Sequence, residues 1–198
     1  MNFSPVAGNL LCEARMAVTP EQLYEQTLVV RSQLGDEAAF AELLGRHGPR
    51  LLMFTQRMMQ SSPADVADLT QEIWLAIFRA LTGLRDASKF RPWAFRIARD
   101  RIHRDYRRRK LPVQPLNETD LETLEDAVND GQPVDSEELQ HCLQSIGPEH
   151  REALVLRFLE DMSYEDIARV TGVSVGTVRS RIHYGKRSLR TAWEGRNL

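Results

Sequence analysis

The chain has 198 residues, 42% of them hydrophobic, and a formal net charge of −2 at neutral pH. This length allows one substantial core or two small ones. No apolar run approaches the roughly 18 residues of a membrane-spanning helix, and the first residues lack the basic start and apolar run of a secretory signal. The two cysteines, Cys12 and Cys142, fit no metal-binding spacing. We therefore expect a cytoplasmic protein with no membrane insertion, metal or cofactor.

The near-neutral total hides a strong segregation of charge. Residues 85–110 contain eleven Lys or Arg and three Asp, whereas residues 111–140 contain nine Asp or Glu and no Lys or Arg. The end of the chain is basic again. Such blocks predict two surfaces that face a polyanion, separated by an acidic connector.

The first half of the chain has helical periodicity. Gly35-Asp36 and Gly48-Pro49 are typical of helix boundaries, and Asp36 is a suitable N-cap. Ser62-Pro63 begins the next predicted helix, because a first-turn proline loses no hydrogen bond. The apolar positions at helical spacing include Phe40, Leu43, Leu44, Leu51, Leu52, Phe54 and Met58, then Val66, Leu69, Ile73, Ile77 and Leu81.

A basic helix is predicted over 92–110, after Gly83 and a short loop. Its apolar positions (Trp93, Ile97, Ile102 and Tyr106) face inward and its arginines outward. We expect Trp93 to pack in the core rather than to stack on a base.

An acidic linker is predicted over 111–136, since this segment combines acidic residues with prolines and few bulky side chains. Helices resume after it and end near Trp193. We therefore predict an all-α fold with an extension at 1–20 and two small helical domains at 21–110 and 137–198, the second a helix-turn-helix (winged-helix-like) domain.

The segment SYEDIARVTGVSVGTVRSRI, residues 163–182, has the spacing of a helix-turn-helix. Ala168 allows two helices to cross closely, Gly172 takes the turn, and Val178 and Ile182 fix the second helix on the first. Ser174 is a suitable N-cap for the second helix. Small residues at its start would let this helix enter a major groove, with Arg179 reaching a guanine edge. The residues expected to face DNA are Ser174, Gly176, Thr177, Arg179, Ser180, Arg181, His183 and Lys186.

Three longer segments resemble bacterial sigma factors. DLTQEIWLAIFRAL (68–81) and FRPWAFRIARDRIHRDYRRRK (90–110) are similar to the second conserved region of that family, and residues 143–190 are similar to the fourth. With only an acidic linker between them, the arrangement resembles the extracytoplasmic function (ECF) subfamily. The resemblance implies a subunit that binds core RNA polymerase, recognises promoter DNA and helps to open it, with an anti-sigma factor as a further partner.

The resemblance also implies roles for individual residues. Asp68, Gln71, Glu72 and Trp74 match the helix that docks on the largest polymerase subunit, and residues 174–187 match the helix that reads the minus-thirty-five element. The loop 82–91 matches the part that captures an unstacked base, and the arginines after it would grip phosphates. The residues assigned to the minus-ten element are Lys89, Phe90, Arg91, Arg96, Arg99, Arg104, Arg107 and Arg108.

Three alternatives compete with this interpretation. An enzyme is disfavoured because the sequence has no P-loop, GxGxxG or GxSxG motif and its histidines are scattered, so no small-molecule substrate is expected. A conventional helix-turn-helix regulator would bind duplex DNA without polymerase, and an anti-sigma factor or adaptor would not need two basic DNA-facing elements. The basic helix next to DLTQEIW favours a sigma factor over both.

Overall fold

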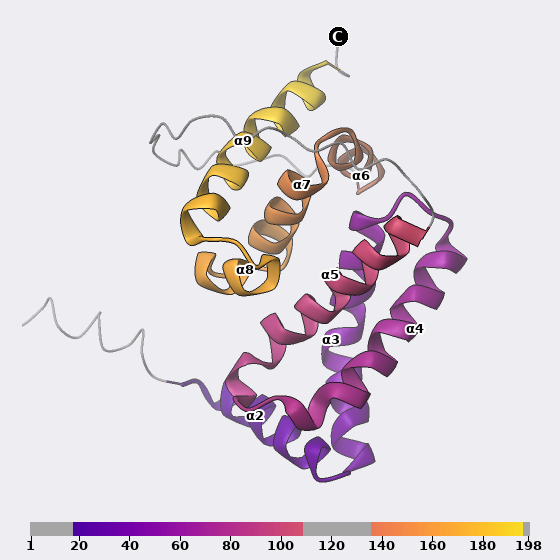
Figure 1. Cartoon of the computed structure of the whole chain (residues 1–198), viewed down its shortest axis with the longest axis vertical. Coiled ribbons are helices and arrows are strands. Elements are labelled where there is room, and N and C mark those ends of the chain that lie inside the picture. Colours follow the sequence, from indigo (N-terminus) through magenta and orange to yellow (C-terminus); the bar gives the residue numbers. More distant parts are fainter. Residues whose placement is uncertain (1–17, 109–135, 196–198) are drawn as a thin grey trace, which may run out of the picture.

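The computed structural model describes residues 18–108 and 136–195, and over these residues helices are the only regular secondary structure (Figure 1). The predicted all-α fold is therefore confirmed there, and no strand in 136–195 forms a wing. Most of the extension at 1–20 and the linker, apart from Ser136, lie outside the described residues. The first group of helices comprises α2 (Pro20–Gln33), α3 (Glu37–Met58), α4 (Pro63–Ala80), the 3-10 turns η1 (Leu81–Gly83) and η2 (Ala87–Lys89), and α5 (Phe90–Arg108). The second comprises α6 (Ser136–Ser145), α7 (Pro148–Leu154), the π-helical turn η3 (Val155–Leu159), α8 (Tyr164–Thr171) and α9 (Val175–Glu194).

Local capping fixes where the first helices begin. The Asp36 carboxylate accepts the backbone N–H of Ala39, and the Ser62 hydroxyl accepts that of Asp65 with Pro63 in the first turn. The apolar stripes of α2 to α5 then meet in one core, whose fully buried members include Leu28, Leu43, Leu51, Phe54, Ile73, Ile77, Phe90 and Phe95. Burying one such side chain contributes roughly 1.5–3 kcal/mol.

The predicted break at Gly48-Pro49 is wrong, because α3 runs without interruption from Glu37 to Met58. Residues on both sides of the proline share one buried stripe: Leu43 and His47 before it, Leu51 and Phe54 after it. Packing of this stripe outweighs the lost backbone hydrogen bond and the ring clash that a proline imposes inside a helix.

The helix-turn-helix of α8 and α9 has the predicted geometry. Ser163 and Ser174 cap the two helices, and Gly172 ends α8 at a φ of 74°, a left-handed conformation that favours glycine. Val178 and Ile182 are 1% and 2% exposed. They hold α9 against α8, so that the opposite side of α9 faces outward.

The two groups of helices pack on each other. Helix α8 lies against α5, and α6 and α7 contact the carboxyl half of α3 (Figure 1). This packing brings the second half of the chain next to the predicted minus-ten helix.

Candidate nucleic-acid interfaces

The amino end of α9 presents an open surface. Ser174, Gly176 and Arg179 are exposed, and Thr177, Ser180 and His183 are half-buried at its edge. The Ser174 hydroxyl accepts the backbone N–H of Thr177 at 3.0 Å and so fixes the first turn. Gly176 adds no side chain there, which allows close approach to another surface. The arrangement suits insertion into a major groove.

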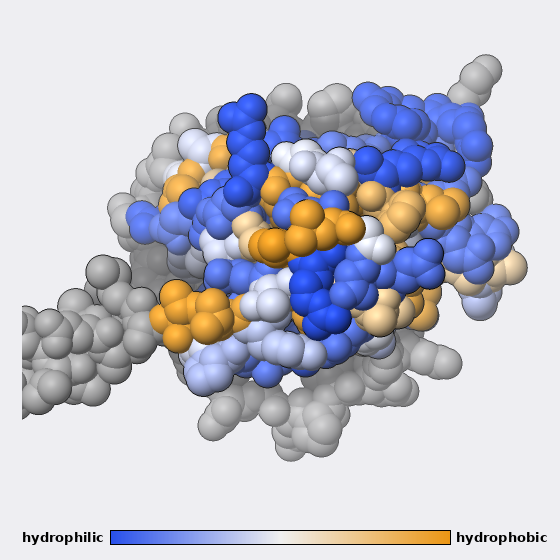
Figure 2. Space-filling model, turned by 90° about the horizontal axis from the view of Figure 1, so that it is seen from below, coloured by the Kyte–Doolittle hydropathy of each residue, from blue (hydrophilic) through white to orange (hydrophobic). Residues whose placement is uncertain are grey.

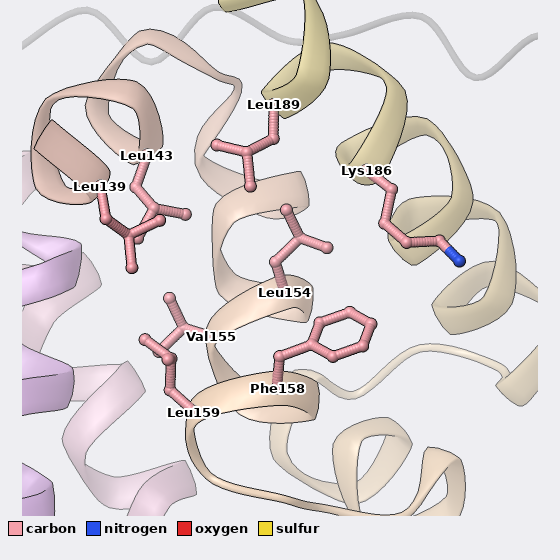
Figure 3. A pocket seen from close by; sticks show the side chains of 8 residues that line it. All are labelled: Leu139, Leu143, Leu154, Val155, Phe158, Leu159, Lys186 and Leu189. Atoms are coloured by element: carbon pink, nitrogen blue, oxygen red, sulfur yellow. The ribbon is translucent and has the colours of Figure 1, made fainter. Parts of the chain in front are cut away.

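One of the residues expected to face DNA is engaged elsewhere, and another lies beside an apolar groove. The Arg181 guanidinium pairs with Glu149 of α7 at 2.7 Å, and its side chain is only 12% exposed. Lys186 lies at the edge of an apolar groove of about 260 Å³. Figure 3 shows its ammonium pointing away from the apolar side chains of that groove. The other lining residues are Leu139, Leu143, Leu154, Val155, Phe158, Leu159 and Leu189. We infer that Arg181 holds α9 on α7 rather than reading a base.

The arginines of α5 that were assigned to the minus-ten element fall into two sets. Arg96, Arg104 and Arg107 are exposed, and Arg108, 75% exposed, pairs with Asp105 at 3.1 Å. The second set, Arg91 and Arg99, points at the second group of helices. Lys89 lies half-buried in η2, just before α5. The first set forms a basic surface with room for phosphates.

Arg91 and Arg99 contact two buried carboxylates of the second group. Arg99 Nε lies 2.9 Å from Glu152 Oε1, and Arg91 Nη2 lies 3.5 Å from Glu160 Oε2. The exposed fractions of Glu152 and Glu160 are only 1% and 3%. Burial raises the pKa of Glu160 to about 7, although Arg91 and Arg50 oppose that rise. The sequence analysis missed this contact, whose only local signal is two acidic residues flanking the apolar run ALVLRFL.

Further hydrogen bonds support this contact, and those from Arg151 to Met58 and from Gln140 to Gln56 join the two groups. The buried Arg151 side chain donates to the carbonyl oxygens of Met58, at 3.3 Å, and Ile146, at 3.2 Å. Tyr106 also donates to the Met58 carbonyl, and Gln140 of α6 donates to Gln56 of α3 at 2.9 Å. Polar side chains and backbone carbonyls therefore contribute to the contact between the groups, beside buried apolar residues of both groups that form one continuous cluster.

Two aromatic residues assigned to partner contacts lie in the core instead. Phe90 is 0% exposed, with its ring edge-on to His47 at 5.1 Å between centroids. Trp74 is 7% exposed and packs edge-on against Phe40. The sequence-based assignments of Phe90 and Trp74 are corrected accordingly, because each ring completes the apolar stripe of its helix. Trp93 is half-buried and packs against the same core, as expected.

Helix α4, which is predicted to dock on RNA polymerase, has an exposed face that carries both polar and apolar side chains. Asp68, Gln71 and Glu72 are exposed along it. Beside them Leu75 and Phe78 are 54% and 56% exposed, a feature that the sequence analysis did not single out. Elsewhere on the first group, at the α2 end, Figure 2 shows exposed apolar side chains as patches among polar ones. An acidic rim beside apolar side chains is typical of a protein-binding surface.

Within the described ranges, no helix combines the length and the apolar character that a bilayer crossing requires. In the same ranges, His, Cys, Asp and Glu side chains form no group of three that could hold a metal ion.

Comparison with known families gives a consistent result for both groups of helices. The family described as Sigma-70 region 2 matches residues 43–111, and the one described as Sigma-70, region 4 matches residues 136–189. RNA polymerase sigma factor CarQ of Myxococcus xanthus is 32% identical over 157 residues, covering 79% of this chain and 90% of the relative. The ECF RNA polymerase sigma-E factor of Escherichia coli is 33% identical over 182 residues, covering 85% and 94%.

Solved structures show the same fold. CnrH in complex with the cytosolic domain of CnrY aligns with a TM-score of 0.67 at 24% identity, over 87% of this chain and 98% of that one. The sigma factor RpoE bound to the anti-sigma factor NepR, from Bartonella quintana, aligns with a TM-score of 0.64 at 23% identity, over 78% and 96%. From its two matched regions and its relatives, the chain belongs to the sigma-70 family of RNA polymerase sigma factors, in the ECF group, whose members direct promoter-specific initiation of transcription.

Proposed function

We propose that this sigma factor reads promoters through two helices, α9 at the minus-thirty-five element and α5 at the minus-ten element. The observation that carries the proposal is the open amino end of α9, where Gly176 and Arg179 are exposed and Thr177 lies at the edge of the exposed surface. Ser174 and Ser180 flank this surface and suit phosphates, and His183 lies one turn further along. We assign the two domains to 21–110 and 137–198, joined by the linker at 111–136.

Helix α5 supplies the basic surface for the minus-ten element. Arg96, Arg104 and Arg107 are exposed and can contact phosphates directly. Arg91 and Arg99 become available to DNA only after α5 separates from the second group, because both now contact buried carboxylates there. Lys89 stands at the start of this helix, beside the loop assigned to base capture.

The exposed face of α4 is the proposed contact with core RNA polymerase. Asp68 and Glu72 supply acidic groups for basic side chains, and Gln71 lies between them. Leu75 and Phe78 add apolar area next to this polar rim. A substitution that reverses charge here tests the docking without touching either DNA-facing helix.

An anti-sigma factor is the further proposed partner, because solved relatives were obtained with the partners CnrY and NepR. We place the protein in the cytoplasm, where polymerase and promoter DNA meet, and assign it no catalytic step of its own. Promoter opening then uses binding free energy from the contacts with polymerase and DNA.

Run-off transcription on a promoter library, with core RNA polymerase in the presence and absence of the protein, tests the proposal. We expect transcripts only with the protein, from promoters that share two spaced sequence elements. Arg179→Ala should change the preferred base in the upstream element, while Arg190→Ala, an exposed arginine far along α9, should leave it unchanged. Silent polymerase together with tight binding of the protein alone to duplex DNA would instead favour a conventional regulator.

A further inference from the structure

Tyr164, the first residue of α8, lies beside two arginines from other elements. The Arg179 guanidinium carbon of α9 lies 5.8 Å from the centre of the Tyr164 ring, and that of Arg157 in η3 lies 5.4 Å from it. Both distances fall within the roughly 6 Å at which a guanidinium is attracted to the face of an aromatic ring. Three elements of the second group therefore converge on one tyrosine.

The position of the Tyr164 ring is itself fixed. Ser163 caps α8 by accepting the backbone N–H of Asp166 at 3.1 Å, and the tyrosine side chain packs against the apolar core of the group. Arg157, the other arginine at the ring, donates to the carbonyl oxygen of Met162 at 3.1 Å. A ring held in this way offers the flexible side chain of Arg179 a contact at a fixed position.

Contact with a ring face leaves the hydrogen-bond donors of an arginine free. Arg181 donates to Glu149 and Arg157 donates to Met162, so each has used part of its guanidinium. Among residues 18–108 and 136–195, no carboxylate lies within ion-pair distance of Arg179. Because a guanine edge is read by two parallel N–H groups of one guanidinium, an arginine oriented by its π face keeps the donors that base reading requires.

We propose that Tyr164 is a positioning residue for promoter specificity, which orders the Arg179 guanidinium before DNA arrives. This inference rests on the proposed function of Arg179 as the base-reading residue of α9. Without the ring, Arg179 samples more rotamers in the free protein, and the cost of ordering it falls on the binding step. Tyr164 then sharpens discrimination at one base pair without contacting that base pair itself.

The test is a comparison of Tyr164→Leu with Tyr164→Phe in the full chain bound to core RNA polymerase. Run-off transcription on a library randomised through the upstream element gives the preference at every base pair. Leucine removes the π face, so we expect the preference at the pair read by Arg179 to fall about two- to five-fold, the range of an exposed cation–π contact. Phenylalanine keeps the ring face and should retain the preference. Other base pairs should be unaffected by either change.

Combination with Arg179→Ala separates this inference from the function on which it rests. In the Arg179→Ala protein, Tyr164→Leu should have no further effect on discrimination at that pair. If Arg179→Ala changes no base preference, the proposed role of Arg179 fails, whatever Tyr164 does. If Arg179→Ala does change one, but Tyr164→Leu weakens transcription equally at all promoters or Tyr164→Phe acts like Tyr164→Leu, the positioning role is overturned in favour of a phosphate contact or a structural role. Thermal unfolding of each variant identifies a folding defect.

Discussion

The buried carboxyl group of Glu160 predicts that the docking of the two groups of helices depends on pH. Its pKa is raised to about 7 from an ordinary value of 4.5, chiefly because burial removes the carboxylate from water. The charged groups that face it are Arg91 from α5 and Arg50 from α3, at 3.5 Å and 3.9 Å. Both belong to the other group, so separation or unfolding exposes Glu160 to water and returns its pKa toward 4.5.

The direction of the pH dependence follows from which state, docked or open, binds the proton. Between about pH 4.5 and about pH 7 the docked state keeps a proton that the open or unfolded state releases, so the contribution of Glu160 to stability is fully present below about pH 4.5 and is lost as the pH rises through 7. From about pH 6 to about pH 8 the equilibrium constant for folding falls about ten-fold, which is a loss of about 1.4 kcal/mol in the free energy of unfolding. Glu160→Gln should lack this component, because an amide does not titrate.

Urea denaturation followed by circular dichroism, at about pH 6 and about pH 8, measures the effect. The original protein should lose about 1.4 kcal/mol more unfolding free energy between these pH values than the Glu160→Gln variant does. Comparison with the variant subtracts the pH dependence that the two proteins share. Parallel pH profiles for the two proteins would refute the reasoning.

Three further predictions concern single residues. Arg179→Ala should reduce discrimination at one base pair of the upstream element by about 1–3 kcal/mol, measured in competition between matched and mismatched promoters; equal loss at all promoters would contradict base reading. Glu72→Lys should weaken assembly with core RNA polymerase, measured by size-exclusion chromatography, whereas Glu37→Lys, at an exposed site at the start of α3, serves as the charge-matched control. Gly185→Ala should destabilise the packing of α9 on α7 by about 1–3 kcal/mol, because the new methyl group would lie 3.1 Å from Leu154 Cγ. Gly45→Ala, which has open space around it in α3, should instead stabilise the protein by up to about 1 kcal/mol. Thermal unfolding measures both effects.

The features that the sequence predicted well are those that depend on nearby residues. The N-caps at Asp36, Ser62 and Ser174 and the left-handed Gly172 each act within one or two turns. The apolar stripe of α9, with Val178 inward, likewise follows from helical period alone. These local rules sufficed to place the open face of α9 with Ser174, Gly176 and Arg179, but not the pairing of Arg181 with Glu149.

The features that could not be predicted from the sequence depend on residues far apart in the chain. Pro49 reads locally as a break, but the core on both sides keeps α3 continuous. Phe90 is the first residue of the basic helix α5, and nothing local shows that its ring meets His47 of α3. The pairing of Arg99 with Glu152 joins positions 53 residues apart, and no spacing rule reaches that distance.

The polar contacts between the two groups of helices affect how easily α5 becomes available to DNA. Arg99 Nε and Glu152 Oε1 are close, yet neither atom has a hydrogen bond, and Arg91 Nε is also buried without one. A buried ion pair with imperfect hydrogen bonding repays little of the desolvation cost of its two charges. Separation of the two groups returns these charges to water, which offsets the loss of contact between α5 and α8. Under the proposed assignment of α5 to the minus-ten element, the same arginines then contact promoter phosphates in place of the carboxylates, so that promoter DNA can replace the contact that now covers α5.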